Sequence, residues 1–135
     1  MNYIDANIFV YAIINNDNKG EVCRNILREV AFNKLKAFTS YLTWDEVIYV
    51  VKKEKNKDIA IMEGSKLLSF PNLNFIRVDK QIIFLAQKLM KNYNLNPRDS
   101  IHAATALIIG AKEIISDDQD FDVIKEIKRI TPVKL

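Results

Sequence analysis

Four acidic residues stand where the sequence pattern changes from a strand to a helix, in segments far apart along the chain. They are Asp5, Glu46, Asp99 and Asp118. Because the carboxyl ends of parallel strands share one edge of a sheet, we expect these carboxylates to converge. Converging carboxylates cannot all stay ionised without a counter-charge, which a hard divalent cation such as Mg2+ supplies. The first chemistry to consider is therefore metal-dependent attack on a phosphodiester.

Each acid also has a structural interpretation. Asp5 and Asp99 precede predicted helices, where an acid stabilises the helix start. Thr43 and Glu46 have the spacing of a capping box, which on this segment alone favours a structural role for Glu46. Asp118 differs, because four of the six residues from 117 to 122 are acidic. Capping does not require so many acids, so this segment favours cation binding.

Other catalytic classes lack the residues they need. His102 is the only histidine and Cys23 the only cysteine. A Ser–His–Asp or Cys–His nucleophile is therefore disfavoured, and a multi-histidine or thiolate zinc site is excluded. The glycines at 20, 64 and 110 are too scattered for a phosphate-binding loop. Carboxylates with a metal ion remain the best-supported chemistry.

The charge distribution favours an acidic pocket in a basic surface. The net charge of +3 becomes +7 once the four candidate acids, which carry −4, are set aside. Basic residues gather in two clusters, Lys52, Lys53, Lys55 and Lys57, and Lys125, Lys128, Arg129 and Lys134. Either cluster could bind a phosphate backbone, although lysines at helix ends are usually solvated.

The length of 135 residues and the composition, 49% hydrophobic and 27% charged, predict one globular domain over residues 1–135. Apolar runs are shorter than a membrane span requires, and the N-terminus lacks the pattern of a signal peptide. We expect a cytoplasmic protein.

Short apolar segments alternate with amphipathic ones. The pattern predicts helices from 8 to about 15, then over 19–32, 43–55, 59–68, 80–93, 100–109 and 121–127. It predicts strands at 3–4, 36–40, 74–78, 113–116 and 129–133. This alternation indicates a three-layer α/β sandwich, with a central, mostly parallel sheet of four to five short strands and helices on both faces.

The four acidic segments together resemble a known family. Residues 3–12, 39–48, 97–104 and 115–122, in this order, are similar to the motifs of the PIN domain family, especially its short VapC-like toxins. The resemblance covers nearly the whole chain. It implies a parallel sheet with Asp5, Glu46, Asp99 and Asp118 at its carboxyl edge, binding one or two Mg2+ or Mn2+ ions.

The resemblance also implies roles for neighbouring residues. Asn7 and Ser116 match small polar positions beside the first and last acids. Asp120 and Asp122 match an acidic tail, and either could assist or replace Asp118, with Asp120 the candidate to accept a proton from water. The candidates for contact with RNA are Arg98, His102, Lys52 and Lys53.

The function that the resemblance implies is metal-dependent hydrolysis of RNA by the toxin of a toxin–antitoxin pair. A small antitoxin is then expected to cover the cleft, and a homodimer or higher homo-oligomer is expected, with the apolar stretches 8–14 and 47–51 as candidate surfaces. The alternatives are a non-catalytic RNA-binding or regulatory subunit, a structure-specific DNA nuclease, or another phosphoryl-transfer protein.

Overall fold

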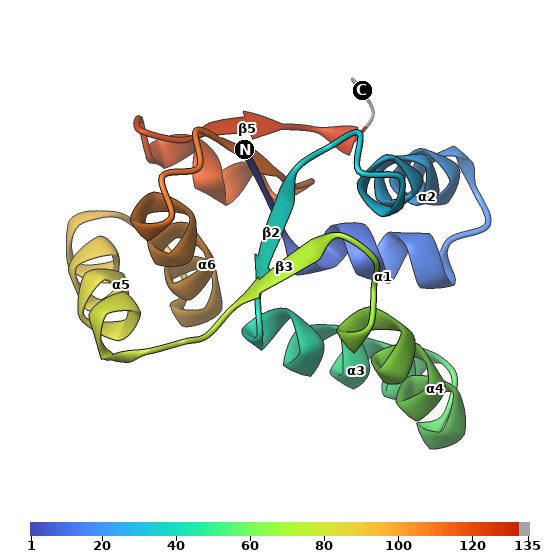
Figure 1. Ribbon diagram of the computed structural model, residues 1–135. Coiled ribbons are helices and arrows are strands. Elements are labelled where there is room, and N and C mark those ends of the chain that lie inside the picture. The colour runs from blue at the N-terminus through green and yellow to red at the C-terminus, as the bar shows by residue number, and fades with distance from the viewer. Residues whose placement is uncertain (133–135) are drawn as a thin grey trace.

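The structure is a computed structural model that describes residues 1–132, and its centre is a parallel sheet (Figure 1). The strands are β1 (Asn2–Ile4), β2 (Ala37–Ser40), β3 (Leu73–Ile76), β4 (Glu113–Ile115) and β5 (Lys128–Ile130). Their order is β3-β2-β1-β4-β5, and every neighbouring pair is parallel. The predicted sheet is confirmed. Position 133, at the end of the expected last strand, lies outside the described residues.

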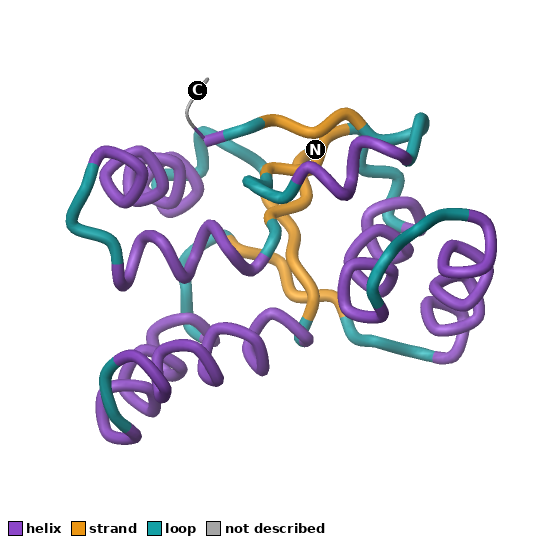
Figure 2. Tube along the Cα trace, turned by 180° about the vertical axis from the view of Figure 1, so that it is seen from behind, coloured by secondary structure: helices purple, strands orange, loops and turns teal. Residues whose placement is uncertain are grey.

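Six α-helices form the two outer layers (Figures 1 and 2). They are α1 (Ala6–Ile14), α2 (Asn18–Ala31), α3 (Leu42–Glu54), α4 (Lys57–Leu68), α5 (Lys80–Asn92) and α6 (Pro97–Ile108). Helices α5 and α6 pack on one face of the sheet, and α1 to α4 pack on the other. This arrangement confirms the three-layer prediction. Among residues 1–132, none of the helices combines the length and apolar character that crossing a membrane requires.

The short helix expected at 121–127 is present with other bounds, as a 3-10 helix, η1 (Gln119–Val123). Its apolar residues explain the difference. Phe121, Ile124 and Ile127 recur every third position, and all three are buried. Because a 3-10 helix has three residues per turn, tight i to i+3 turns direct residues with this spacing to the same side. The amides of Ile124 and Ile127 make such bonds to the carbonyls three residues earlier.

The core lies on both faces of the central strands. Side chains of a strand alternate between faces, so Tyr3 packs toward α5 and α6 while Ile4 packs toward α1 to α4. The central strands are thus buried on both sides, as in parallel sheets generally. On α6, the small residues 103, 104 and 106 are buried, which allows this helix to lie close to the sheet.

Gly20 lies near the end of α1, at the start of α2. A Cβ atom there would lie 2.1 Å from the carbonyl oxygen of Asn15, a backbone atom that moves only if α1 and α2 shift apart. We expect Gly20→Ala to lower the melting temperature by about 10 °C, equivalent to roughly 3 kcal/mol. Thermal unfolding followed by circular dichroism measures this change.

Gly64→Ala is the matched control. A Cβ at Gly64 would meet the Ile48 Cδ1 atom at 2.9 Å, the mobile end of a side chain. Alanine also favours a helix over glycine by about 1 kcal/mol. We expect the melting temperature of Gly64→Ala to change by a few degrees at most. Equal falls in the melting temperatures of the two variants would contradict this account of Gly20.

Candidate functional site

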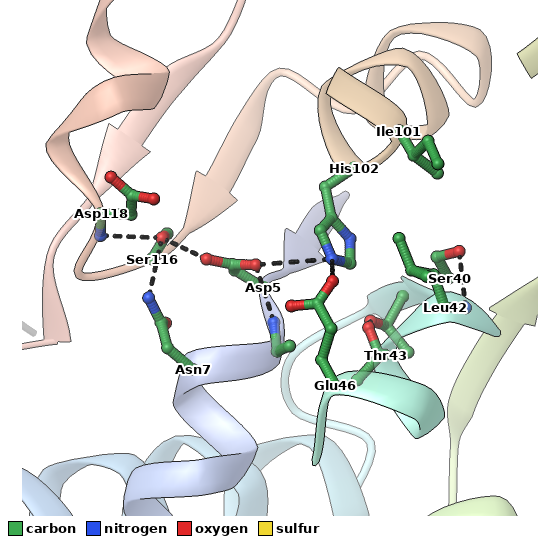
Figure 3. Close-up of polar contacts among 12 residues, drawn as sticks. Asp5, Asn7, Ser40, Leu42, Thr43, Glu46, Ile101, His102, Ser116 and Asp118 are labelled. Carbon is green, nitrogen blue, oxygen red and sulfur yellow. Dashed lines mark hydrogen bonds and ion pairs between the residues drawn. The ribbon is translucent and has the colours of Figure 1, made fainter. Parts of the chain in front are cut away.

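The acidic segments meet at the carboxyl edge of the central strands (Figure 3). Asp5 follows β1, Asp118 follows β4, and Glu46 and Asp99 lie in the early turns of α3 and α6. Strand order reverses on the two sides of β1, and ligands of open α/β sheets bind at such a point. A cleft of about 850 Å³ opens there, with Glu46, Asp99 and Asp118 in its lining.

Two groups of side chains could each hold a metal ion. Within each group, the ligand atoms all lie within 4.8 Å of one another. The first group comprises Asp5, Glu46 and His102, and the second comprises Asp99, Asp118 and Asp120. The four predicted acids therefore divide between the two groups, two in each, with His102 and Asp120 as the further members, and the charge of Asp5 acts on Asp99 in the other group.

Asp5 is held by hydrogen bonds from two directions. Its Oδ1 accepts from the Ala6 amide at 2.8 Å, which also stabilises the start of α1. Its Oδ2 accepts from the Ser116 hydroxyl at 2.6 Å. Burial raises the pKa of the Asp5 carboxyl, although the nearby His102 and the Ser116 bond act against this rise. Helix capping and a site role are thus compatible in this residue.

Ser116 connects several site residues. Besides donating to Asp5, its hydroxyl oxygen accepts from the Asp118 amide at 3.0 Å and from Asn7 Nδ2 at 3.4 Å. The small polar side chains at 7 and 116 therefore hold the loop that carries Asp118 against the start of α1 (Figure 3).

The capping-box interpretation of Glu46 is wrong. Helix α3 begins at Leu42, with Tyr41 as its N-cap, so Thr43 lies inside the first turn. The Thr43 hydroxyl instead bonds Thr39 at 2.7 Å. Glu46 Oε1 lies 2.7 Å from His102 Nε2, and its side chain points into the site.

His102 is fully buried between the sheet and the acids. Its Nδ1 lies 2.6 Å from the Tyr3 hydroxyl, and its Nε2 lies 3.8 Å from Asp5 Oδ1. Burial lowers the pKa of His102, but the hydrogen bond to Glu46 and the charge of Asp5 more than offset this effect and raise it. Tyr3 was not among the site residues predicted from the sequence. Because side chains alternate along β1, Tyr3 and Ile4 lie on opposite faces of the sheet.

In the second group, the Asp99 carboxyl has a raised pKa. Asn96 is the N-cap of α6, and Pro97 and Asp99 lie in its first turn. The Asp99 carboxylate lies within 4.8 Å of ligand atoms of Asp118 and Asp120. Burial, then the charges of Asp118 and Asp5, raise the pKa of Asp99 to about 7. Such repulsion among converging carboxylates is what a bound cation relieves. Asp118 also accepts from the Asp120 amide at 2.9 Å and starts η1.

This raised pKa predicts how stability depends on pH. The Asp99 pKa is about 7 in the fold against an ordinary value of 3.8, so the folded state binds more protons between these values. The stability that the Asp99 carboxyl contributes is then fully present at low pH and is lost as pH rises through about 7. We expect the wild-type melting temperature in EDTA to fall by several degrees from about pH 5.5 to pH 8, and Asp99→Asn to fall less. Identical pH profiles for the two proteins would contradict this.

The remaining predicted residues lie around the cleft. Asp120 and Asp122 are exposed, and Asp122 pairs with Arg129 at 2.8 and 3.1 Å. Arg98, also exposed, lies 3.9 Å from Asp45. Lys52 and Lys53 occupy the last turn of α3, about 9–10 Å along the helix axis from Glu46. Asp122 is therefore directed at Arg129 rather than into either group of ligand atoms.

The model of the PIN domain matches residues 3–127. The chain belongs to the PIN domain family. No curated protein matches the sequence of this PIN domain.

Solved structures with the same fold include toxins and toxin–antitoxin complexes. VapC20 of Mycobacterium tuberculosis, described as a sarcin-ricin loop cleaving toxin, is 12% identical over 93% of this chain and 95% of that one, with a TM-score of 0.78. VapBC2 of Rickettsia felis, bound to a DNA fragment from its promoter, is 23% identical over 97% and 98%, with a TM-score of 0.74. A Klebsiella pneumoniae toxin–antitoxin complex is 23% identical over 98% of both chains, with a TM-score of 0.70. At such identities the likeness establishes a shared fold.

Proposed function

We propose that this PIN domain is a metal-dependent ribonuclease that hydrolyses RNA phosphodiester bonds. The observation that carries the proposal is the convergence of Asp5, Glu46, Asp99 and Asp118 at one sheet edge, in two groups of ligand atoms. Membership of the PIN family supports it.

The acids fit a hard divalent cation. Asp99, Asp118 and Asp120 form an all-oxygen set, the type that Mg2+ and Mn2+ bind, while Asp5 and Glu46 bring carboxylates to the other group. Burial, and then the charges of Asp118 and Asp5, raise the pKa of Asp99 to about 7, and a bound cation would offset both effects. When bound, Mg2+ or Mn2+ supplies an activated water at neutral pH and positive charge for the phosphate.

The side chains themselves provide the rest of the chemistry. Asp5 is fixed by Ser116 and by the Ala6 amide, so its carboxylate needs little reorganisation. Asp120 lies at the exposed rim of the second group and is the candidate to accept a proton from the attacking water. Arg98 stands at the cleft with its guanidinium exposed, where it can bind a phosphate.

Lys52 and Lys53 are proposed to hold the RNA backbone beyond Glu46. The logarithm of the RNA-binding constant falls linearly with the logarithm of the salt concentration. For the double variant Lys52→Ala/Lys53→Ala, we expect this slope to become shallower by about 0.7 for each phosphate contact that is lost. Filter binding at several salt concentrations, in an Asp99→Asn background that prevents cleavage, measures the slope. Lys125→Ala, from the other basic cluster, is the control. An unchanged slope in the double variant would exclude these lysines from the interface.

We further propose that this ribonuclease is the toxin of a toxin–antitoxin pair. Solved structures with this fold include toxin–antitoxin complexes, which supports the proposal. A groove of about 480 Å³ between α1, α2 and α4, lined by Phe9, Ile13, Leu27 and Phe70, is a further candidate surface for the antitoxin, beside the acidic cleft that we expect it to cover. In the expected surface at 47–51, Val47 and Val51 are buried in the core, whereas Tyr49 is 68% exposed, so the outer face of α3 stays available to a partner. A homodimer remains part of the proposal.

The experiment that tests the nuclease is incubation of purified protein with a set of structured RNAs in Mg2+, Mn2+ or EDTA. Cleavage in metal that stops in EDTA and returns when excess metal is added would support the proposal. Metal-dependent cutting of DNA flaps with intact RNA would favour a structure-specific DNA nuclease. RNA binding without any cleavage would favour a non-catalytic RNA-binding subunit.

A further inference from the structure

Tyr3 and His102 are fully buried polar residues to which the proposed reaction assigns no task. Tyr3 lies on β1, and His102 lies one turn after Asp99 on α6. The Tyr3 hydroxyl is 2.6 Å from His102 Nδ1, and His102 Nε2 is 2.7 Å from Glu46 Oε1. The two side chains therefore form a chain of hydrogen bonds from the sheet interior to a proposed metal ligand.

The chemistry of the carboxylate fixes the direction of the bond to Glu46. An ionised carboxylate only accepts, so His102 Nε2 carries the hydrogen that it shares with Glu46. In a neutral imidazole Nδ1 then accepts from the Tyr3 hydroxyl, and in an imidazolium Nδ1 donates to the Tyr3 oxygen; Tyr3 is the partner of Nδ1 in both forms. A partner of this kind fixes both the tautomer and the orientation of the ring. The edge-on contact between the Tyr3 and His102 rings, with centroids 5.7 Å apart, further restrains the imidazole.

The imidazole also separates two acids. Its Nε2 lies 3.8 Å from Asp5 Oδ1 as well as 2.7 Å from Glu46 Oε1 (Figure 3). A donor between two carboxylates reduces the cost of bringing them together. Because Glu46 Oε1 is occupied by His102, Oε2 is the oxygen left for another partner.

We propose that His102, fixed by Tyr3, is a positioning residue that holds the Glu46 carboxylate in place for a divalent ion. The inference rests on the proposed function, because it requires Glu46 to be a metal ligand. It replaces RNA contact as the role of His102, since the ring is fully buried and both of its nitrogens have protein partners.

The test compares Mn2+ binding by calorimetry in four proteins: wild type, His102→Leu, His102→Gln and Tyr3→Phe. Leucine removes the donor to Glu46, and we expect the Mn2+ affinity to fall about 10–100-fold, as for other partners that orient a metal ligand. Glutamine offers an amide donor and acceptor side by side, so it should restore most of the affinity. Tyr3→Phe keeps the packing and removes only the hydroxyl, and it should weaken binding by a smaller factor than His102→Leu.

The outcomes separate this inference from the nuclease proposal. Equal Mn2+ affinity in wild type, His102→Leu and Tyr3→Phe would overturn the positioning role and leave the metal site standing. Absence of Mn2+ binding by the wild-type protein would overturn both. Pulsed electron paramagnetic resonance adds a signature independent of activity: a nitrogen-14 coupling to bound Mn2+ would make His102 a direct ligand and overturn the proposal. If His102→Leu does not fold, Tyr3→Phe and His102→Gln still provide the comparison.

Discussion

Asp99→Asn should lower the rate of metal-dependent RNA cleavage by at least about 1000-fold, a loss of roughly 4 kcal/mol in transition-state stabilisation. The Asp99 carboxylate is half-buried and belongs to the second group of ligand atoms, and the charges of Asp118 and Asp5 act on it. Asparagine keeps the shape of the side chain but removes the charge that a hard cation needs. Initial rates on one RNA in saturating Mn2+ measure the effect.

The same substitution should leave the fold intact and stabilise the metal-free protein near pH 8. It removes a carboxylate whose pKa is raised by burial and then by the charges of its neighbours, so that its ionisation near pH 8 costs stability. Loss of activity together with a higher melting temperature would be the signature of a site acid rather than a structural one. Loss of activity with a large fall in melting temperature would instead indicate that the variant is misfolded, and retained activity would exclude Asp99 from the site.

Asp118→Asn and Asp122→Asn should differ by about 100-fold or more in cleavage rate, although the two acids are four residues apart. Asp118 lines the cleft beside Asp99, and its loop is fixed by Ser116. Asp122, with 54% of its side chain exposed, pairs with the mostly buried Arg129 and takes no part in either group of ligand atoms. We therefore expect a loss of at least about 100-fold for Asp118→Asn and less than about 3-fold for Asp122→Asn.

Parallel kinetics of these two variants on one RNA provide the comparison, with melting temperatures as a control for folding. Equal losses of cleavage rate in the two variants would mean that the acids of residues 117–122 act through their combined charge rather than through individual positions. A larger loss for Asp122→Asn would move the site away from the cleft and toward Arg129.

The sheet and the meeting of the acids could be predicted from local patterns. Strand residues such as Ile4 and Ile114 occur in short apolar runs between amphipathic helices, and parallel pairing follows from that alternation. Once the strands are parallel, residues that follow them, such as Asp5 and Asp118, must share an edge. This part of the prediction depends on topology rather than on side-chain detail.

The contacts within the site could not be predicted in the same way. Tyr3 and His102 are 99 positions apart in the sequence, and only the packing of α6 on β1 brings their polar atoms together. The spacing of Thr43 and Glu46 indicates a cap only if Thr43 precedes α3; in the structure the helix has already begun, and the Leu42 amide donates to the Ser40 hydroxyl instead. The period of three in Phe121, Ile124 and Ile127 matches the tight i to i+3 turns that continue beyond η1.

The most direct test of the central claim is the chemistry of the cut ends when the wild-type protein cleaves RNA in Mn2+. Hydrolysis by water, which a metal held by the four carboxylates would activate, should leave a terminal phosphate monoester and a free hydroxyl, with one oxygen-18 in the phosphate when the reaction is run in labelled water. A 2′,3′-cyclic phosphate, formed equally well in EDTA, would show that the ribose 2′-hydroxyl is the nucleophile. That result would contradict hydrolysis by a carboxylate-bound metal.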